Sequence, residues 1–137
     1  MLQNNTNLKL LGFGNNPLGT LPNGLLRHTA SLQVLGLSET RMNGDIWQEL
    51  KYPMNITELQ LGNNNINRID RSVLQGLKYV KHLDLRDNEI GMIETNSFIG
   101  QGLLETLYLS NNEISDIKES AFRGLKSLMR LDLSYNQ

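Results

Sequence analysis

The chain contains no cysteine, and this absence excludes several kinds of chemistry. Without thiols there is no disulfide bond, no thiolate metal site and no cysteine nucleophile. The absence does not decide the cellular compartment, because a stretch of a secreted protein can lack cysteine as readily as a cytosolic domain. The two histidines, His28 and His82, are far apart in the chain and have no third ligand beside them, so we predict no metal and no cofactor.

Long hydrophobic runs and a strong net charge are also missing. The apolar runs are only a few residues long, too short to insert into a bilayer, and the first residues show no signal peptide. The net charge of −1 and the pI near 6.1 provide no field that would attract nucleic acid or an anionic membrane, so we expect neither as a partner. Apolar residues make up only 39%, which favours an elongated shape over a compact globule.

What the sequence does contain is a repeat of 24 residues. A leucine recurs at this interval, at Leu11, Leu35, Leu59, Leu83, Leu107 and Leu131. A second apolar column follows two residues later, at Phe13, Leu37, Leu61, Leu85, Leu109 and Leu133. A polar column lies three residues beyond that, at Asn16, Thr40, Asn64, Asn88, Asn112 and Asn136. Such regularity predicts one array over residues 1–137, of about five and a half repeats that start at residues 8, 32, 56, 80, 104 and 128.

Each repeat is expected to contribute one short strand. The segment Leu83-Asp84-Leu85 alternates apolar and polar residues, as a strand with one buried face does. Strands that always run in the same direction stack into a parallel sheet on one side of a solenoid. The remaining stretches are short, so we expect loops and brief helical turns on the outer side. The predicted fold class is therefore an α/β solenoid.

The polar column lies where the chain leaves each strand. An Asn side chain carries both donors and an acceptor, and at a buried turn it can satisfy backbone groups of its own and the adjacent repeat. We therefore predict a structural ladder formed by Asn16, Asn64, Asn88, Asn112 and Asn136. Thr40 offers only a hydroxyl, so the second repeat should form a weaker rung.

These columns resemble the leucine-rich repeat family. Residues 80–90 (VKHLDLRDNEI) follow the pattern L-x-x-L-x-L-x-x-N-x-L/I that characterises it. The repeat length, residues 21–26 (LPNGLL) and residues 121–125 (AFRGL) are similar to the typical animal extracellular subclass, as in Toll-like receptors, Slit-type guidance proteins and adhesion proteins such as chaoptin. The resemblance implies a horseshoe with its parallel sheet on the concave face, and protein binding without catalysis.

The second repeat and the two ends depart from this pattern. Asp45 replaces an apolar residue, and residues 42–46 (MNGDI) resemble plant-receptor repeats, so we expect an irregular outer surface near Tyr52-Pro53. Trp47 could serve there as an exposed binding anchor or pack against the outer surface. Extracellular members of the family usually carry cysteine-rich caps, and none is present, so we expect a part of a longer array.

The exposed strand positions are the binding candidates. The first two repeats carry small, mostly neutral residues there, whereas repeats four to six carry charges and aromatic rings. The predicted ligand-binding residues on the concave face are His82, Asp84, Arg86, Asp87, Glu105, Tyr108, Arg130, Asp132 and Tyr135. The alternative is ordinary solvation, with Arg86 paired to Asp84 or Asp87. Catalysis is not expected, because a carboxylate pair for sugar hydrolysis needs a closed cleft and this face should be open.

Two asparagines, Asn4 and Asn55, head N-glycosylation triplets. A chain so rich in Asn, Ser and Thr should contain roughly two by chance, so they do not indicate secretion. The sequence thus predicts a ligand-recognition segment of a cell-surface or secreted receptor or adhesion protein. Its partner would be a protein ligand or co-receptor, with a homodimer of the parent protein as a further option. The alternative is an intracellular, cytoplasmic scaffold or regulatory domain.

Overall fold

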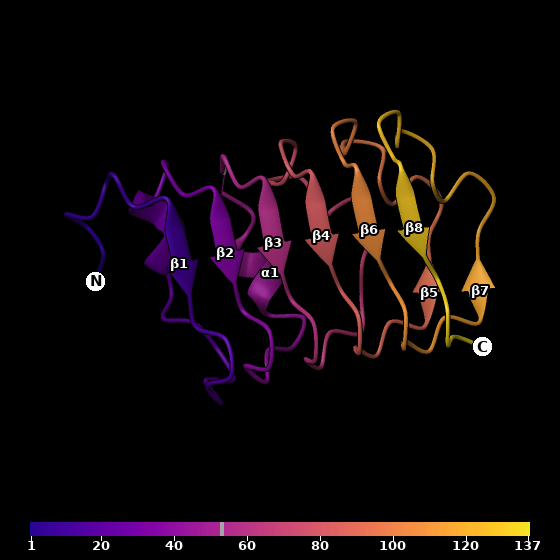
Figure 1. Cartoon of the computed structure of the whole chain (residues 1–137), viewed down its shortest axis with the longest axis horizontal. Coiled ribbons are helices and arrows are strands. Elements are labelled where there is room, and N and C mark those ends of the chain that lie inside the picture. The colour runs from indigo at the N-terminus through magenta and orange to yellow at the C-terminus, as the bar shows by residue number, and fades with distance from the viewer. Residues whose placement is uncertain (53) are drawn as a thin grey trace.

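The computed structural model describes residues 1–52 and 54–137. Six strands lie side by side in chain order and form one parallel sheet (Figure 1). They are β1 (Leu10–Gly12), β2 (Val34–Gly36), β3 (Glu58–Gln60), β4 (His82–Asp84), β6 (Thr106–Tyr108) and β8 (Arg130–Asp132). The register pairs equivalent residues of neighbouring repeats, as in Leu11 with Leu35 and Leu59 with Leu83. The 24-residue period therefore sets the strand register directly, and the predicted solenoid is confirmed.

Short elements occupy the other side of the solenoid. These are a 3₁₀ helix η1 (Leu25–His28), a helix α1 (Ile46–Glu49), and the strands β5 (Met92–Ile93) and β7 (Asp116–Ile117). The prediction of loops and brief helical turns is confirmed, but β5 and β7 pair as a second parallel sheet that was not predicted. Strands of two residues are too short to reveal an alternating pattern. No helix in the described part of the chain is long and apolar enough to cross a membrane.

The apolar columns fill the interior between these two sides. Leucines of the first two columns are fully buried in the central repeats: Leu35, Leu37, Leu59, Leu61, Leu83, Leu85, Leu107 and Leu109. Phe98 is also fully buried, and its ring stacks on that of Phe122 at a centroid distance of 6.0 Å. The core is thus a series of similar layers, each closed by its neighbours.

Each strand is followed by a left-handed backbone turn at the same point of the repeat. The residue before the polar column has a positive φ in all six repeats, at Asn15, Glu39, Asn63, Asp87, Asn111 and Tyr135. Asn and Asp tolerate this conformation better than other non-glycine residues, which fits four of these six positions. The turn directs the chain away from the sheet and brings the next side chain under the strand ends.

The predicted asparagine ladder is present as hydrogen bonds. The Nδ2 group of Asn88 donates to the carbonyl oxygens of Leu61 at 2.9 Å and of Leu85 and Arg86 at 3.1 Å, and its Oδ1 accepts from Ile66 N at 3.0 Å. Asn64, Asn112 and Asn136 make equivalent bonds to the preceding repeat. Within the described part of the chain, the side chain of Asn16, in the first repeat, binds only carbonyl groups of its own turn, those of Phe13 and Gly14.

Thr40, which occupies the asparagine column in the second repeat, makes fewer ladder bonds, as predicted. The Thr40 hydroxyl donates to Leu37 O in its own repeat, and within the described residues its side chain makes no bond to the first repeat. The joint between the first two repeats therefore lacks the side-chain bridge that Asn64, Asn88, Asn112 and Asn136 supply at the later joints.

The second repeat is irregular on its outer side, as its sequence indicates. Residues 44–45, equivalent to β5 and β7 of later repeats, form a turn instead of a strand, and helix α1 follows directly. Trp47 is buried, with 3% of its surface exposed, and its Nε1 donates to Arg68 O at 2.9 Å. Packing of Trp47 against the outer side is therefore confirmed, and the alternative of an exposed anchor is wrong. Pro53 lies outside the described residues.

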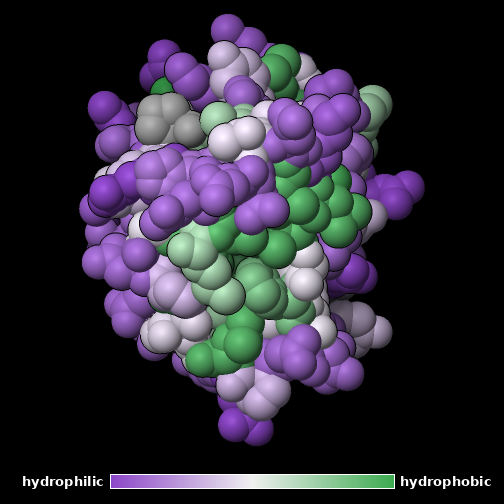
Figure 2. Space-filling view, turned by 90° about the vertical axis from the view of Figure 1, so that its left-hand side faces the viewer, coloured by the Kyte–Doolittle hydropathy of each residue, from purple (hydrophilic) through white to green (hydrophobic). Residues whose placement is uncertain are grey.

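The first and last repeats expose part of their apolar columns. Figure 2 views the N-terminal end, where hydrophobic residues form a continuous band across the face. Leu18 is 42% exposed although its counterparts Met42 and Ile66 are buried, and at the other end Leu131 is 38% exposed although Leu107 is buried. Apolar surfaces of this kind promote association.

We expect that fusing a polar-capped repeat to each end of the chain would raise its melting temperature and favour the monomer. The added layers would bury Leu18 and Leu131, each contributing at most about 1.5–3 kcal/mol. Differential scanning calorimetry and analytical ultracentrifugation of the capped and uncapped chains provide the measurement. An uncapped chain that is already monomeric and equally stable would contradict this expectation.

Candidate functional site

Four predicted residues form a connected row across the exposed face of the sheet in repeats four to six. Arg86 makes a bidentate ion pair with Asp84, with Nε to Oδ1 at 3.0 Å and Nη2 to Oδ2 at 2.6 Å. The Arg86 guanidinium also lies over the Tyr108 ring, 4.8 Å from its centroid. From the next strand, Arg130 Nη1 donates to the Tyr108 hydroxyl at 3.1 Å. We call Asp84, Arg86, Tyr108 and Arg130 the sheet-face row.

The strands explain why these four residues meet. Asp84 and Tyr108 are register partners at the ends of β4 and β6, and Asp132 follows at the end of β8. Arg86 lies two residues after Asp84, so its side chain projects from the same face. The row therefore holds a half-buried phenol between two guanidinium groups, which restrict the ring.

A hollow of about 390 Å³ adjoins the row on the side of the third repeat. It is lined by Ser38, Glu58, Leu59, Gln60, His82, Leu83, Asp84, Arg86 and Tyr108. Glu58, Gln60 and Ser38 were not selected from the sequence, although they occupy the same strand columns as His82, Asp84 and Arg86.

Hydrogen bonds and ion pairs keep the row charged. The side-chain hydrogen bond and the charge of Asp84 raise the pKa of Arg86, and the Tyr108 hydroxyl raises that of Arg130. Hydrogen bonds from Ser134 lower the pKa of Asp132, and the nearby Arg86 lowers it further. The face therefore presents fixed charges of both signs at neutral and mildly acidic pH.

The remaining predicted residues do not join the row. Glu105 lies 3.9 Å from Lys81 in an ion pair, and His82 is exposed at the start of β4. Asp87 and Tyr135 lie beyond the strands in the left-handed turns, and Tyr135 is 81% exposed. The sheet face thus combines a fixed centre with individually solvated groups around it. Pairing of Arg86 with Asp84, foreseen in the alternative interpretation, is confirmed.

The two glycosylation candidates lie on the surface. Asn4 is exposed in the N-terminal turn, and Asn55 is exposed shortly before β3. Asn55 Nδ2, the atom that would carry a glycan, donates to Ala30 O at 2.9 Å. Modification of Asn55 would therefore replace or rearrange this bond, and use of either site remains a prediction.

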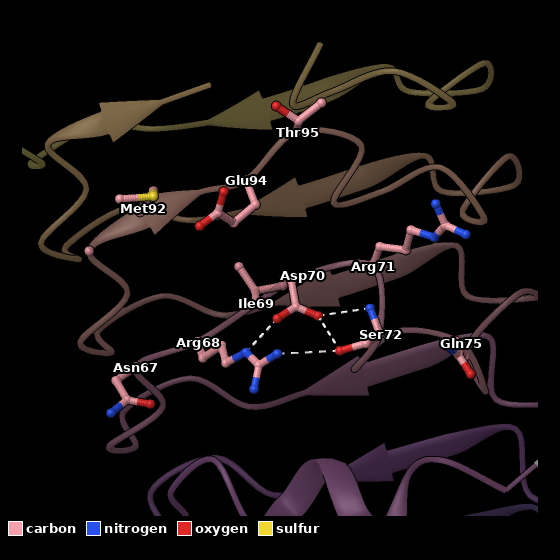
Figure 3. A pocket seen from close by; sticks show the side chains of 11 residues that line it. Asn67, Arg68, Ile69, Asp70, Arg71, Ser72, Gln75, Met92, Glu94 and Thr95 are labelled. Atoms are coloured by element: carbon pink, nitrogen blue, oxygen red, sulfur yellow. Dashed lines mark hydrogen bonds and ion pairs between the residues drawn. The ribbon is translucent and has the colours of Figure 1, made fainter. Parts of the chain in front are cut away.

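A larger, open hollow of about 920 Å³ lies on the outer side, between the third and fourth repeats (Figure 3). Its polar centre is Asp70, which accepts from Arg68 and from the backbone and hydroxyl of Ser72. Partial burial by itself raises the pKa of Asp70, but these hydrogen bonds outweigh it and keep the pKa below its usual value. Asp70, Arg68 and Ser72 are thus bound to one another. Residues 1–52 and 54–137 contain no cluster of three His, Asp or Glu side chains that could hold a metal ion.

Comparisons with known proteins agree with this architecture. The chain matches the leucine rich repeat family over residues 54–114 and 102–137, together more than half of its length. No curated protein sequence gives a significant match. A solved structure of the Toll–Spatzle complex in its glycosylated form contains a chain with 26% identity and a TM-score of 0.79, aligned over 93% of this chain and 17% of that one.

A second structure of that complex, described as a molecular hub in Drosophila development and innate immunity, shows the same fold. Its chain is 22% identical, with a TM-score of 0.68 over 98% of this chain. The protein described here spans no more than about a quarter of either solved chain. With its 24-residue register, its parallel sheet and its asparagine ladder, the chain belongs to the leucine-rich repeat family and has a Toll-like architecture.

Proposed function

We propose that the chain is a non-enzymatic protein-interaction module that binds its partner on the sheet face of repeats four to six. The observation that carries this proposal is the sheet-face row, in which Tyr108 is held between Arg86 and Arg130. Interfaces draw most of their energy from a few anchors, and Tyr and Arg are enriched among them. A ring that is already immobilised loses little conformational entropy when the partner binds. Less of the binding free energy from its contact area is therefore cancelled by that entropy loss.

We further propose that this module is a ligand-recognition segment of a cell-surface or secreted receptor or adhesion protein. The subclass of its repeats and its likeness to chains of the Toll–Spatzle complex support this assignment. A protein ligand or co-receptor is the partner that an open, mixed-charge face fits. Acidic residues outnumber basic ones around the row, with Glu58, Asp87 and Asp132 close by, which favours a partner surface with excess positive charge.

An intracellular scaffold or regulatory domain is the second candidate. The observation that favours it is the absence of cysteine throughout the chain. The two candidates differ in what accompanies the array in the parent protein. Cysteine-rich caps and a signal peptide would support the receptor, whereas a cytosolic catalytic domain would support the scaffold.

We expect the double variant Tyr108→Ala with Arg130→Ala to weaken partner binding by about 2 kcal/mol or more. Both side chains are on the surface and outside the core, so the variant should unfold at nearly the same temperature as the wild type. The measurement is the dissociation constant of the partner, purified after isolation on immobilised wild-type protein, determined by biolayer interferometry.

The matched control is Lys118→Ala with Lys126→Ala on the opposite side of the array. Both lysines are exposed, and the ion pair of Lys118 with Asp116 is a surface pair of small energetic value. Loss of binding in this control, with no change in the sheet-face variant, would assign the partner to the outer surface and overturn the proposed site.

A further inference from the structure

A buried carboxylate on α1 lacks half of its hydrogen-bond partners. Glu49 is only 7% exposed, and its Oε1 accepts from Gly24 N at 2.7 Å. Its Oε2 is shielded from solvent and has no partner among the described residues. A buried acceptor without a donor costs free energy, and a charged one costs more. The second oxygen therefore marks a place where an additional donor would be stabilising.

Glu49 also lines a hollow of about 390 Å³ between the first and second repeats, on the outer side. Apolar side chains of Leu21, Met42 and Ile46 form part of its wall, and Asp45 adds a second carboxylate. This size lies within the range of small-molecule sites, which combine apolar walls with a few polar groups. The hollow is on a different element and a different side from the sheet-face row.

The one cationic side chain of this wall does not neutralise the carboxylates. The Nζ atom of Lys51 lies 3.5 Å from Gln48 Oε1 and 5.6 Å from the centroid of the Tyr52 ring. Among the described residues it forms no ion pair with Asp45 or Glu49. The wall therefore carries an excess negative charge beside an apolar surface.

We propose that this hollow binds a small molecule with a primary ammonium group on an apolar body. On binding, the Glu49 side chain turns its shielded Oε2 toward the hollow, where the ammonium group donates to it, and the exposed Asp45 adds attraction at the entrance. The apolar body contacts Leu21, Met42 and Ile46. Binding at this place involves no residue of the proposed partner surface, so it is independent of the proposed function.

Trp47 provides the measurement, because it is the single tryptophan of the chain and neighbours Ile46 and Glu49 on the same helix. Its fluorescence would be followed during titration with n-butylamine at pH 7, with n-butanol at matched ionic strength as the neutral counterpart. We expect a saturable change with n-butylamine and a much weaker response with n-butanol. Equal responses to both compounds would overturn the proposal.

Variants locate the site. Glu49→Gln keeps the oxygen that accepts from Gly24 and replaces the unpartnered oxygen with an NH₂ group, so it should fold while weakening n-butylamine binding about tenfold or more, the loss of one charge-assisted bond. Asp45→Asn should weaken it by a smaller factor, and the exposed Glu119→Gln is the matched control that should change nothing.

Lys51→Gln tests whether the chain supplies its own donor. We expect this change to leave n-butylamine binding the same or tighter, because it removes a competing positive charge. Should Glu49→Gln and Lys51→Gln instead lower the melting temperature equally, with no n-butylamine response in any variant, Lys51 would be the true partner of Glu49 and the proposal would be wrong.

Discussion

Phe98→Ala is expected to lower the free energy of unfolding by about 3–5 kcal/mol, the largest effect of any single truncation considered. The ring is fully buried, so its removal leaves a cavity that the layered core cannot close by local collapse. The change also removes the stacking with Phe122, a contact worth about 0.5–1.5 kcal/mol beyond burial. Urea unfolding followed by circular dichroism provides the measurement.

The adjacent Ile99→Ala is the matched control for Phe98. Ile99 is 42% exposed, so its truncation should cost far less, at most about 1 kcal/mol. If Phe98→Ala and Ile99→Ala changed the midpoint of urea unfolding by the same amount, the fourth repeat would not be packed in the way described.

Asn88→Asp should destabilise the fold by about 3 kcal/mol or more at pH 7, whereas Asn88→Ala should cost about 1–3 kcal/mol. The two side chains of Asn and Asp have the same shape, but the carboxylate replaces a donor with an acceptor. Three carbonyl oxygens, at 2.9–3.1 Å from Nδ2, would then face an oxygen rather than an N–H group. The alanine variant leaves the three carbonyl oxygens without a donor but places no negative charge beside them, so it costs less free energy than the aspartate variant.

The effect of Asn88→Asp should shrink as the pH falls. Burial and the surrounding carbonyl oxygens would raise the pKa of the introduced carboxyl in the folded state above its unfolded value near ~3.9. For a group with a raised folded pKa, the stabilising contribution is fully present below the unfolded pKa and is lost as the pH rises through the folded pKa. The difference from wild type, measured by urea unfolding, should therefore be smaller at pH 4 than at pH 7.

Asn111→Asp is the control for this ladder substitution. Asn111 is exposed in a left-handed turn, and the equivalent position of the fourth repeat already carries Asp87. The same chemical change should cost little there. A similar loss of stability at Asn88 and Asn111 would show that the ladder bonds are not the cause.

The features that the sequence predicted are those that recur in every repeat. Leu35, Leu59 and Leu83 recur at one interval, and a fixed interval with one strand per turn dictates a parallel sheet in register. The asparagine ladder was predictable for the same reason, since one donor and acceptor set recurs at each turn. The pairing of Arg86 with Asp84, two residues apart on one strand face, also follows from strand periodicity.

The features that escaped prediction depend on contacts that occur only once. The immobilisation of Tyr108 between two arginines requires specific side-chain conformations on three strands. Packing of Trp47 was one of its two predicted roles, but the helix α1 that carries it is a single turn that the repeat pattern does not predict. The hollow beside Glu49 arises between two unlike repeats, so no column of residues could reveal it.

The missing side-chain bridge at Thr40 has a consequence for how the array comes apart. In a solenoid each layer is held only by its neighbours, so opening proceeds layer by layer and begins where adjacent layers are least coupled. The first repeat is joined to the second by the backbone pairing of β1 with β2 and by outer contacts such as Gly24 with Glu49 and Arg27 with Tyr52. The N-terminal layer is thus the first to detach, before the layers that Asn64, Asn88, Asn112 and Asn136 join to their neighbours.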